Sequence, residues 1–126
     1  MHARVTHHGE VAVLSFDAGE ILDSHNAGDV KAQAFRRLDG RCDLVIDLQN
    51  LEFVDSAGLG VLVGIYKRVK QRGQRVAVAR AQPYVARVMR IIRLDRVFES
   101  FPDVASALVE LAPSAAVGAG QTETRR

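Results

Sequence analysis

The stretch LVIDLQNLEFVDSAGLGVLVGIYKRVKQRGQRVAVA, residues 44–79, predicts a strand, a loop, a helix and a second strand. After Asp43 at its start, the segment 42–48 is apolar on both faces except for Asp47, which is typical of a strand in the middle of a parallel sheet. A helix of about 57–71 follows, and its apolar stripe consists of Leu59, Leu62, Ile65, Tyr66 and Val69. RVAVAR, residues 75–80, is the next strand. This order predicts a right-handed crossover between two parallel strands.

Similar patterns on either side extend this unit into an alternation of strands and helices. The other strands that we expect are a weak run from residue 3, VAVLSF at 11–16 and RVFESF at 96–101. The other helices that we expect are one of about 26–38, one opened by Pro83, and one from Val104 to Leu111. Alternation of this kind predicts the α/β fold class, with a mixed sheet of four to five strands, mostly parallel core strands and about four helices.

The composition suits one compact domain. The chain has 126 residues, of which 48% are hydrophobic. We expect the domain to span residues 1–112, because the segment 113–126 has no apolar periodicity and is typical of a disordered tail. The formal net charge is only +2, since 17 basic residues nearly balance 15 acidic ones. This balance argues against direct binding of nucleic acid.

The sequence also predicts a cytoplasmic protein that does not contact a membrane. Its single cysteine, Cys42, has no partner for an internal disulfide and is typical of a small buried apolar residue. No apolar run approaches the roughly 20 residues of a membrane span. The N-terminus lacks the apolar core of a signal peptide.

Motifs for catalysis or cofactor binding are absent from the sequence. None of the four histidines has the spacing of metal ligands on one helix. The sequence contains no nucleophile elbow, P-loop or dinucleotide-binding fingerprint. We therefore expect a protein that is not an enzyme, with no catalytic residues, metal ligands or cofactor.

The loop and first helical turn, VDSAGLG at 54–60, need a separate explanation. Each glycine in a helix costs about 1 kcal/mol relative to alanine. Ser56 has two interpretations: it caps the helix by accepting from the N–H of Gly58 or Leu59, or it is a phosphorylation site. A bare helix N-terminus tolerates a negative group, and small residues there let a second protein approach closely.

Three segments together carry a resemblance to a known family. They are the stretch 44–79, the turn GEILDS at 19–24 and the segment PYVARVMRIIRLDRVFESFPDVASAL at 83–108. In this order they resemble the STAS domain of the anti-sigma factor antagonist family, over roughly residues 5–111. Two features depart from the family pattern: GEILDS has one extra residue, and Arg93 stands where a glycine commonly precedes the leucine.

The resemblance implies a phosphorylation-controlled partner-switching protein that regulates transcription in the cytoplasm. It implies that Ser56 is phosphorylated by an anti-sigma factor that is itself a GHKL-type serine kinase. The unphosphorylated antagonist would bind this kinase and free the sigma factor, and the phosphorylated form would release it. A PP2C-type phosphatase would restore the serine.

The partner is expected to dock around Ser56. The residues that we expect to contact it are Asp23, Asp55, Ala57, Gly58, Leu59 and Gly60. Leu59 is either an apolar anchor for the partner or part of the core. Asp55 either orients the serine hydroxyl or forms the turn at the end of the loop. Asp23 is either a docking residue or a helix cap.

Other functions remain open from the sequence. One alternative is a STAS subunit of a lipid-transport ABC system that binds its ATPase, although Ser56 within DSAGLG favours the switch. A second alternative is a nucleic-acid binder, which would use a basic surface formed by Arg87, Arg90, Arg93 and Arg96. The low net charge and the lack of interleaved aromatic residues indicate instead that these arginines form a solvated face. Nucleotide binding would need a phosphate loop, and none is present.

Overall fold

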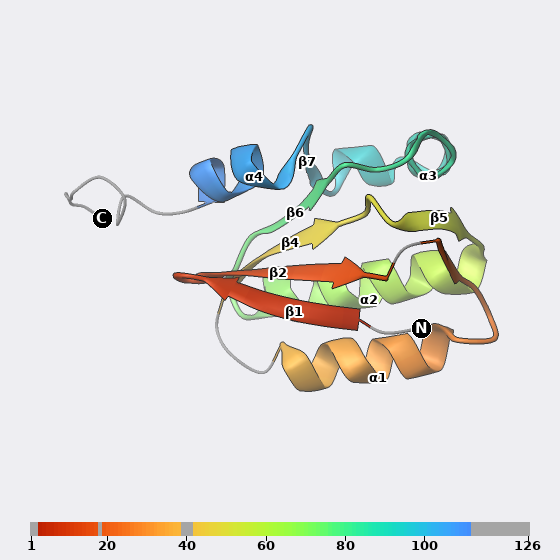
Figure 1. Cartoon of the computed structure of the whole chain (residues 1–126), viewed down its shortest axis with the longest axis horizontal. Helices are drawn as coiled ribbons and strands as arrows, with labels where there is room; N and C mark the ends of the chain where they lie inside the picture. The colour runs from red at the N-terminus through yellow and green to blue at the C-terminus, as the bar shows by residue number, and fades with distance from the viewer. Residues whose placement is uncertain (1–2, 18, 39–41, 112–126) are drawn as a thin grey trace.

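The computed structural model describes residues 3–17, 19–38 and 42–111. In chain order, the elements are β1 (Ala3–His8), β2 (Val11–Phe16), β3 (Glu20–Leu22), α1 (Ala27–Arg37), β4 (Asp43–Asp47), β5 (Leu51–Val54), α2 (Ser56–Gln71), β6 (Val76–Ala79), α3 (Pro83–Ile91), the short 3-10 helix η1 (Leu94–Arg96), β7 (Glu99–Phe101) and α4 (Val104–Leu111). The strands and helices form layers, which Figure 1 shows from the side of the sheet.

The main sheet has five strands in the order β1-β2-β4-β6-β7. The hairpin partner β1 is antiparallel to β2, and the other neighbours are parallel. Strand β4 lies in the middle, where Leu44, Val45 and Ile46 are fully buried. This explains its nearly continuous apolar sequence, since a central parallel strand is covered on both faces. The predicted α/β class and mixed sheet are confirmed.

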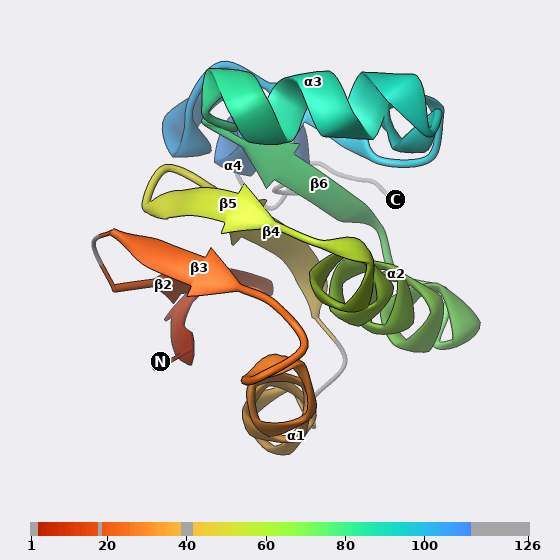
Figure 2. The same ribbon diagram turned by 90° about the vertical axis from the view of Figure 1, so that its right-hand side faces the viewer.

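Helices cover both faces of this sheet. Helices α1 and α2 lie on one face, where Val30, Leu62 and Ile65 pack into the larger core cluster. Helix α4 covers the other face, where Ala107 and Leu111 contact a smaller cluster of valines and alanines. Figure 2 shows α3 lying across the end of the molecule beside β6 and β5. No helix within the described ranges is long and apolar enough to cross a bilayer.

A second sheet, made of β3 and β5 in parallel, was not predicted from the sequence. The segment around Phe53 was expected to be a loop, but residues 51–54 form a strand. Strands this short show too little alternation to be recognised by periodicity alone. In the ladder Leu22 is opposite Val54, so both strands end at the same edge. This pairing brings Asp23 and Asp55 to neighbouring positions.

The segment after α3 also differs from the expectation of one strand over residues 96–101. It forms η1 and then the three-residue strand β7. Arg93, between α3 and η1, has a φ of 67° and lies in the left-handed region. That conformation favours glycine because a Cβ is crowded there. The geometry explains why a glycine suits this position and why Arg93 is a strained replacement.

Candidate functional site

Ser56 is the first residue of α2 and is exposed to solvent. It follows β5 by a single residue, Asp55, so the strand end and the helix start meet at the serine. Within the part of the chain that the structure describes, the Ser56 hydroxyl has no hydrogen-bond partner. A reactive partner can therefore approach the hydroxyl from solvent without first displacing an internal contact.

The N-cap of α2 is Asp55, so the alternative interpretation of Ser56 as the cap of this helix is wrong. The backbone of Asp55 is extended, with φ −107° and ψ −170°, as a capping residue requires. Its Oδ1 accepts from the Gly58 N–H at 2.9 Å. Because Asp55 takes the capping contact, the hydroxyl of Ser56 is left free.

Asp55 also joins the helix to the turn that follows β3. Its Oδ2 accepts from the Ser24 N–H at 3.0 Å, and its own N–H donates to the Leu22 carbonyl at 3.3 Å. The N–H of Gly58, with those of Ser24 and Ala57, lowers the pKa of the Asp55 carboxyl against a weaker opposing effect of desolvation. The ionised carboxylate thus holds two loops together beside Ser56.

Asp23 lies in that neighbouring turn and is half-buried. Its carboxylate accepts from the N–H of His25 at 2.9 Å, and its carbonyl accepts from the N–H of Ala27 at 2.8 Å. Asn26 occupies the N-cap position of α1, but its side chain bonds back to Asp23 and to the Ile21 carbonyl instead of capping the helix. Asp23 therefore stabilises the turn that starts α1, and its position beside the serine loop leaves a docking role open.

The small residues of the first turn of α2 have different surroundings. Gly58 is buried, and a Cβ added there would lie 2.3 Å from the Leu22 carbonyl oxygen. The space expected for a partner at this residue is thus taken by the chain's own β3. Gly60 is exposed, and a Cβ there would meet no atom within 4 Å. Ala57 is half-buried.

Leu59 falls between its two expected roles. It is half-buried and packs against the edge of the larger core cluster. The inward stripe of α2 is formed by Gly58, Val61, Leu62, Ile65 and Val69. Val61 was missed by the sequence analysis, whereas the predicted Tyr66 is only half-buried. The part of Leu59 that remains accessible lies one turn from Ser56 and is available to a docking protein.

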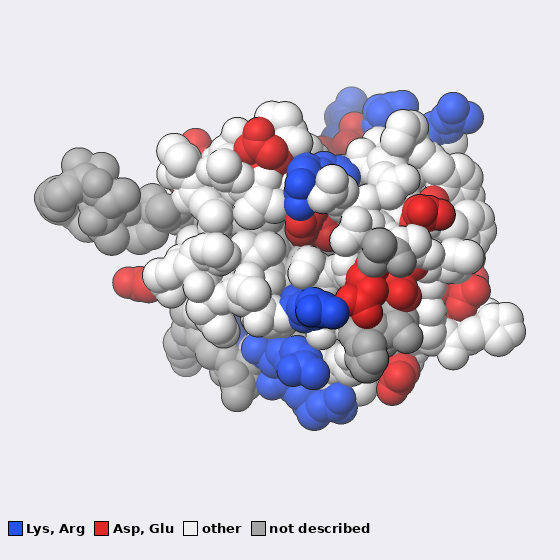
Figure 3. All heavy atoms as spheres, viewed as in Figure 1, with Lys and Arg blue, Asp and Glu red and all other residues white. Residues whose placement is uncertain are grey.

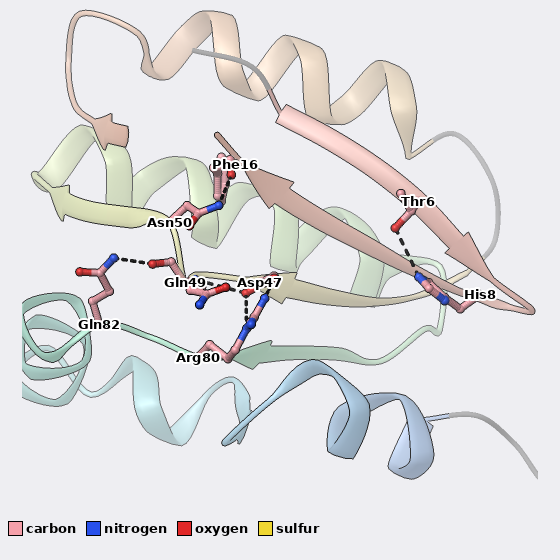
Figure 4. A network of polar contacts seen from close by, with 8 residues as sticks. All are labelled: Thr6, His8, Phe16, Asp47, Gln49, Asn50, Arg80 and Gln82. Atoms are coloured by element: carbon pink, nitrogen blue, oxygen red, sulfur yellow. Dashed lines mark hydrogen bonds and ion pairs between the residues drawn. The ribbon is translucent and has the colours of Figure 1, made fainter. Parts of the chain in front are cut away.

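A polar network behind β5 was also missed by the sequence analysis (Figure 4). Asp47 is only 9% exposed, and the Arg80 guanidinium donates to both of its carboxylate oxygens, at 2.6 and 3.2 Å. The Gln82 side chain donates to the Gln49 carbonyl. Asp47 ends the apolar run of its strand, and its partner is distant in sequence. The network fixes the start of α3 against the loop between β4 and β5.

The arginines considered for nucleic-acid binding lie on α3 and in the segment that follows it. Arg87, Arg90, Arg93 and Arg96 are exposed, and Figure 3 shows basic side chains along the outer edge over α3. No group of three or more His, Cys, Asp or Glu within the described ranges could hold a metal ion. Among the residues considered at this site, Ser56 is the one whose side chain is both exposed and reactive.

Comparisons with known proteins agree with this architecture. A family model described as the STAS domain matches residues 2–107. An anti-sigma F factor antagonist of Paenibacillus polymyxa is 34% identical over 113 residues, covering 88% of this chain and 95% of that protein. A solved STAS domain protein of Planctomyces limnophilus has a TM-score of 0.80 at 27% identity, covering 87% of this chain and 97% of that one. An anti-sigma factor antagonist of Mycobacterium paratuberculosis has a TM-score of 0.77 at 25% identity, covering 88% and 93% of the two chains.

Proposed function

The chain belongs to the STAS domain family, and we propose that it is an anti-sigma factor antagonist controlled by phosphorylation of Ser56. In this proposal the unphosphorylated chain binds an anti-sigma factor that is a GHKL-type serine kinase. Phosphorylation of Ser56 releases the complex, and a PP2C-type phosphatase restores the serine. The observation that carries the proposal is the exposed, unpartnered hydroxyl of Ser56 at the start of α2.

The chain is the substrate in this switch. The Ser56 oxygen attacks the γ-phosphorus of ATP bound to the kinase, and the bond from that phosphorus to the ADP oxygen breaks. A base on the kinase accepts the hydroxyl proton. The phosphatase later transfers the phosphoryl group to water, which regenerates the hydroxyl. The catalytic groups are supplied by the partners.

The geometry supports release by charge. A phosphate adds about −1.5 to −2 charges. Asp55 already occupies the Gly58 N–H and carries a negative charge beside Ser56, so the phosphate would not replace that capping contact. The domain would stay folded while its surface at the start of α2 became strongly negative. Burying that charge in an interface without a matching cation would cost several kcal/mol.

The proposal is tested by intact-mass spectrometry after incubation with the GHKL-type serine kinase of the same genome and ATP. We expect the wild-type chain to gain one phosphate and Ser56→Ala to gain none. Ser24→Ala is the matched control, because Ser24 is also exposed and lies beside Asp55. We expect this control to be phosphorylated like the wild type. Phosphate on Ser56→Ala, or its loss from Ser24→Ala alone, would contradict the assignment.

Binding completes the test. Ser56→Ala should bind the kinase as tightly as the wild type, and Ser56→Asp should bind at least tenfold more weakly because it places a carboxylate at the interface. Calorimetry with the kinase and ADP measures both. If the wild-type chain neither binds the kinase nor takes phosphate from it, but binds the ATPase of a lipid-transport system, the alternative STAS role replaces this proposal.

A further inference from the structure

We propose that Ile21, Phe53 and Tyr84 form the apolar anchor by which the serine kinase docks before it reaches Ser56. We call these three residues the apolar strip. The inference rests on the proposed function and adds to it the surface and the chemistry of the partner. The strip lies outside the group of residues around Ser56 that the sequence analysis selected.

The strip is one continuous surface built from three elements. Ile21 of β3 and Phe53 of β5 are opposite each other in the parallel ladder. The ring of Phe53 stacks on the ring of Tyr84 in α3, with centroids 5.2 Å apart and an interplanar angle of 18°. The three residues are 48%, 39% and 44% exposed. Large apolar side chains that cluster at this exposure are typical of protein-binding surfaces.

The strip is held in place before any partner binds. Phe53 and Ile21 are fixed by the pairing of β3 with β5. Tyr84 is in the first turn of α3, whose N-cap residue Gln82 donates through its side chain to the Gln49 carbonyl (Figure 4). A prearranged aromatic pair loses little conformational freedom on binding, so most of its buried area contributes to affinity.

The distance to Ser56 places the strip within the area that a kinase must cover. Phe53 precedes Ser56 by three residues, which span at most about 11 Å even in a fully extended chain. A specific interface covers about 800 Å² on each partner, equivalent to a disc of roughly 16 Å radius. An enzyme that forms such an interface centred on Ser56 therefore also covers Phe53.

The charges around the strip define the partner's chemistry. Glu52 is exposed and precedes Phe53, while Asp23 and Asp55 follow the two strands of the small sheet. The exposed Arg87 lies one turn after Tyr84 in α3. The complementary surface is an apolar patch with basic groups toward the small sheet and acidic groups toward α3.

The test compares the affinity of strip variants for the kinase with ADP, measured by calorimetry on the unphosphorylated chain. We expect Phe53→Thr and Tyr84→Ser each to raise Kd at least tenfold, and Ile21→Thr to raise it less. Thr is β-branched and suits a strand. Ile91→Thr is the matched control, because Ile91 is 71% exposed at the far end of the same helix as Tyr84. Thermal melts check that each variant is folded.

The outcomes separate this inference from the proposed function. If the wild-type chain binds the kinase and is phosphorylated on Ser56, but folded Phe53→Thr and Tyr84→Ser both bind within twofold of it, the strip is not the anchor. The strip is also ruled out as the anchor if Ile91→Thr weakens binding as much as these two variants do. If the wild-type chain itself does not bind, the proposed function fails and the strip has no kinase to anchor.

Discussion

Asp55 connects the two loops that frame the exposed serine. One of its carboxylate oxygens caps α2 at Gly58, and the other accepts from Ser24 in the turn after β3. A neutral side chain at this position would keep neither contact at its present strength, because hydrogen bonds to an ionised acceptor are about twice as strong as neutral ones. The position of Ser56 relative to the β3 turn therefore depends on the ionisation of Asp55.

This dependence predicts how stability changes with pH. The pKa of Asp55 is lowered in the folded chain, so its stabilising effect is fully present above the ordinary aspartate pKa of about 3.9 and is lost as the pH falls through the lower folded value. We expect Asp55→Asn to be less stable than the wild type at pH 7, with a difference that shrinks as the pH falls below the ordinary aspartate pKa. Urea unfolding of both chains across this range measures the difference.

The two chains share every other titrating group, so the comparison isolates Asp55. A difference in the free energy of unfolding that stays constant from about pH 7 to about pH 3 would show that the charge of Asp55 does not stabilise the fold. In that case the hydrogen bonds to the Asp55 carboxylate would not contribute measurably to the free energy of unfolding.

At the scale of the elements, the sequence predicted those whose pattern is long enough to show a period. The buried strand 11–16 and the helix ending at Gln71 match the structure. The strands β3 and β5 were missed because they have only three and four residues. The interpretation of Ser56 as a helix cap places the cap one residue too late. Asp55 and Ser56 are both good caps, and only the extended backbone at Asp55 decides between them.

The site was predictable to the same degree. Ser56 was identified from its motif, and the structure places it in solvent. The role of Gly58 was not predictable, because a sequence shows that a residue is small but not which atoms fill the space beside it. Here that space is filled by the Leu22 backbone. The polar pair of Asp47 and Arg80 was missed for a similar reason, as it joins residues from two different strand ends.

The glycines of α2 give a prediction at this scale. Gly58→Ala should lower the free energy of unfolding by about 1 to 3 kcal/mol, because its Cβ would lie 2.3 Å from the Leu22 carbonyl oxygen and the backbone there would have to move. Gly60→Ala should raise it by up to about 1 kcal/mol, because its Cβ meets open space and alanine favours a helix. Urea unfolding of the two variants measures both changes.

Opposite signs for the two substitutions are the required result. Equal stabilisation of both variants would mean that Leu22 and the first turn of α2 adjust freely to a methyl group. A partner could then approach the backbone at Gly58 as well as at Gly60, as the sequence alone predicted.

For the whole molecule, the two faces of the main sheet are covered unequally. Helices α1, α2 and α3 and the small sheet pack into the larger core, whereas α4 supplies Ala107 and Leu111 to the smaller one. The residues under α4 include Val11, Val45 and Ala77 from three neighbouring strands. The Ser56 site lies at the start of α2 and not on α4, so the second face contributes to stability without contacting the docking surface.

This separation predicts the effect of shortening the chain. The sequence predicts that residues 113–126 form a disordered tail, so a chain ending at Ala112 should keep the free energy of unfolding and the kinase affinity of the full chain. A chain ending at Asp103 lacks α4, and its free energy of unfolding should fall by at least about 3 kcal/mol, because Leu111 is removed and the valines beneath it meet water.

A single substitution under α4 gives a related prediction. Leu111→Ala in the full chain should lower the free energy of unfolding by about 2 to 5 kcal/mol while the chain still binds the kinase. Urea unfolding and calorimetry test all three chains. A loss of stability in the chain ending at Ala112, comparable to that without α4, would mean that the domain extends beyond residue 112.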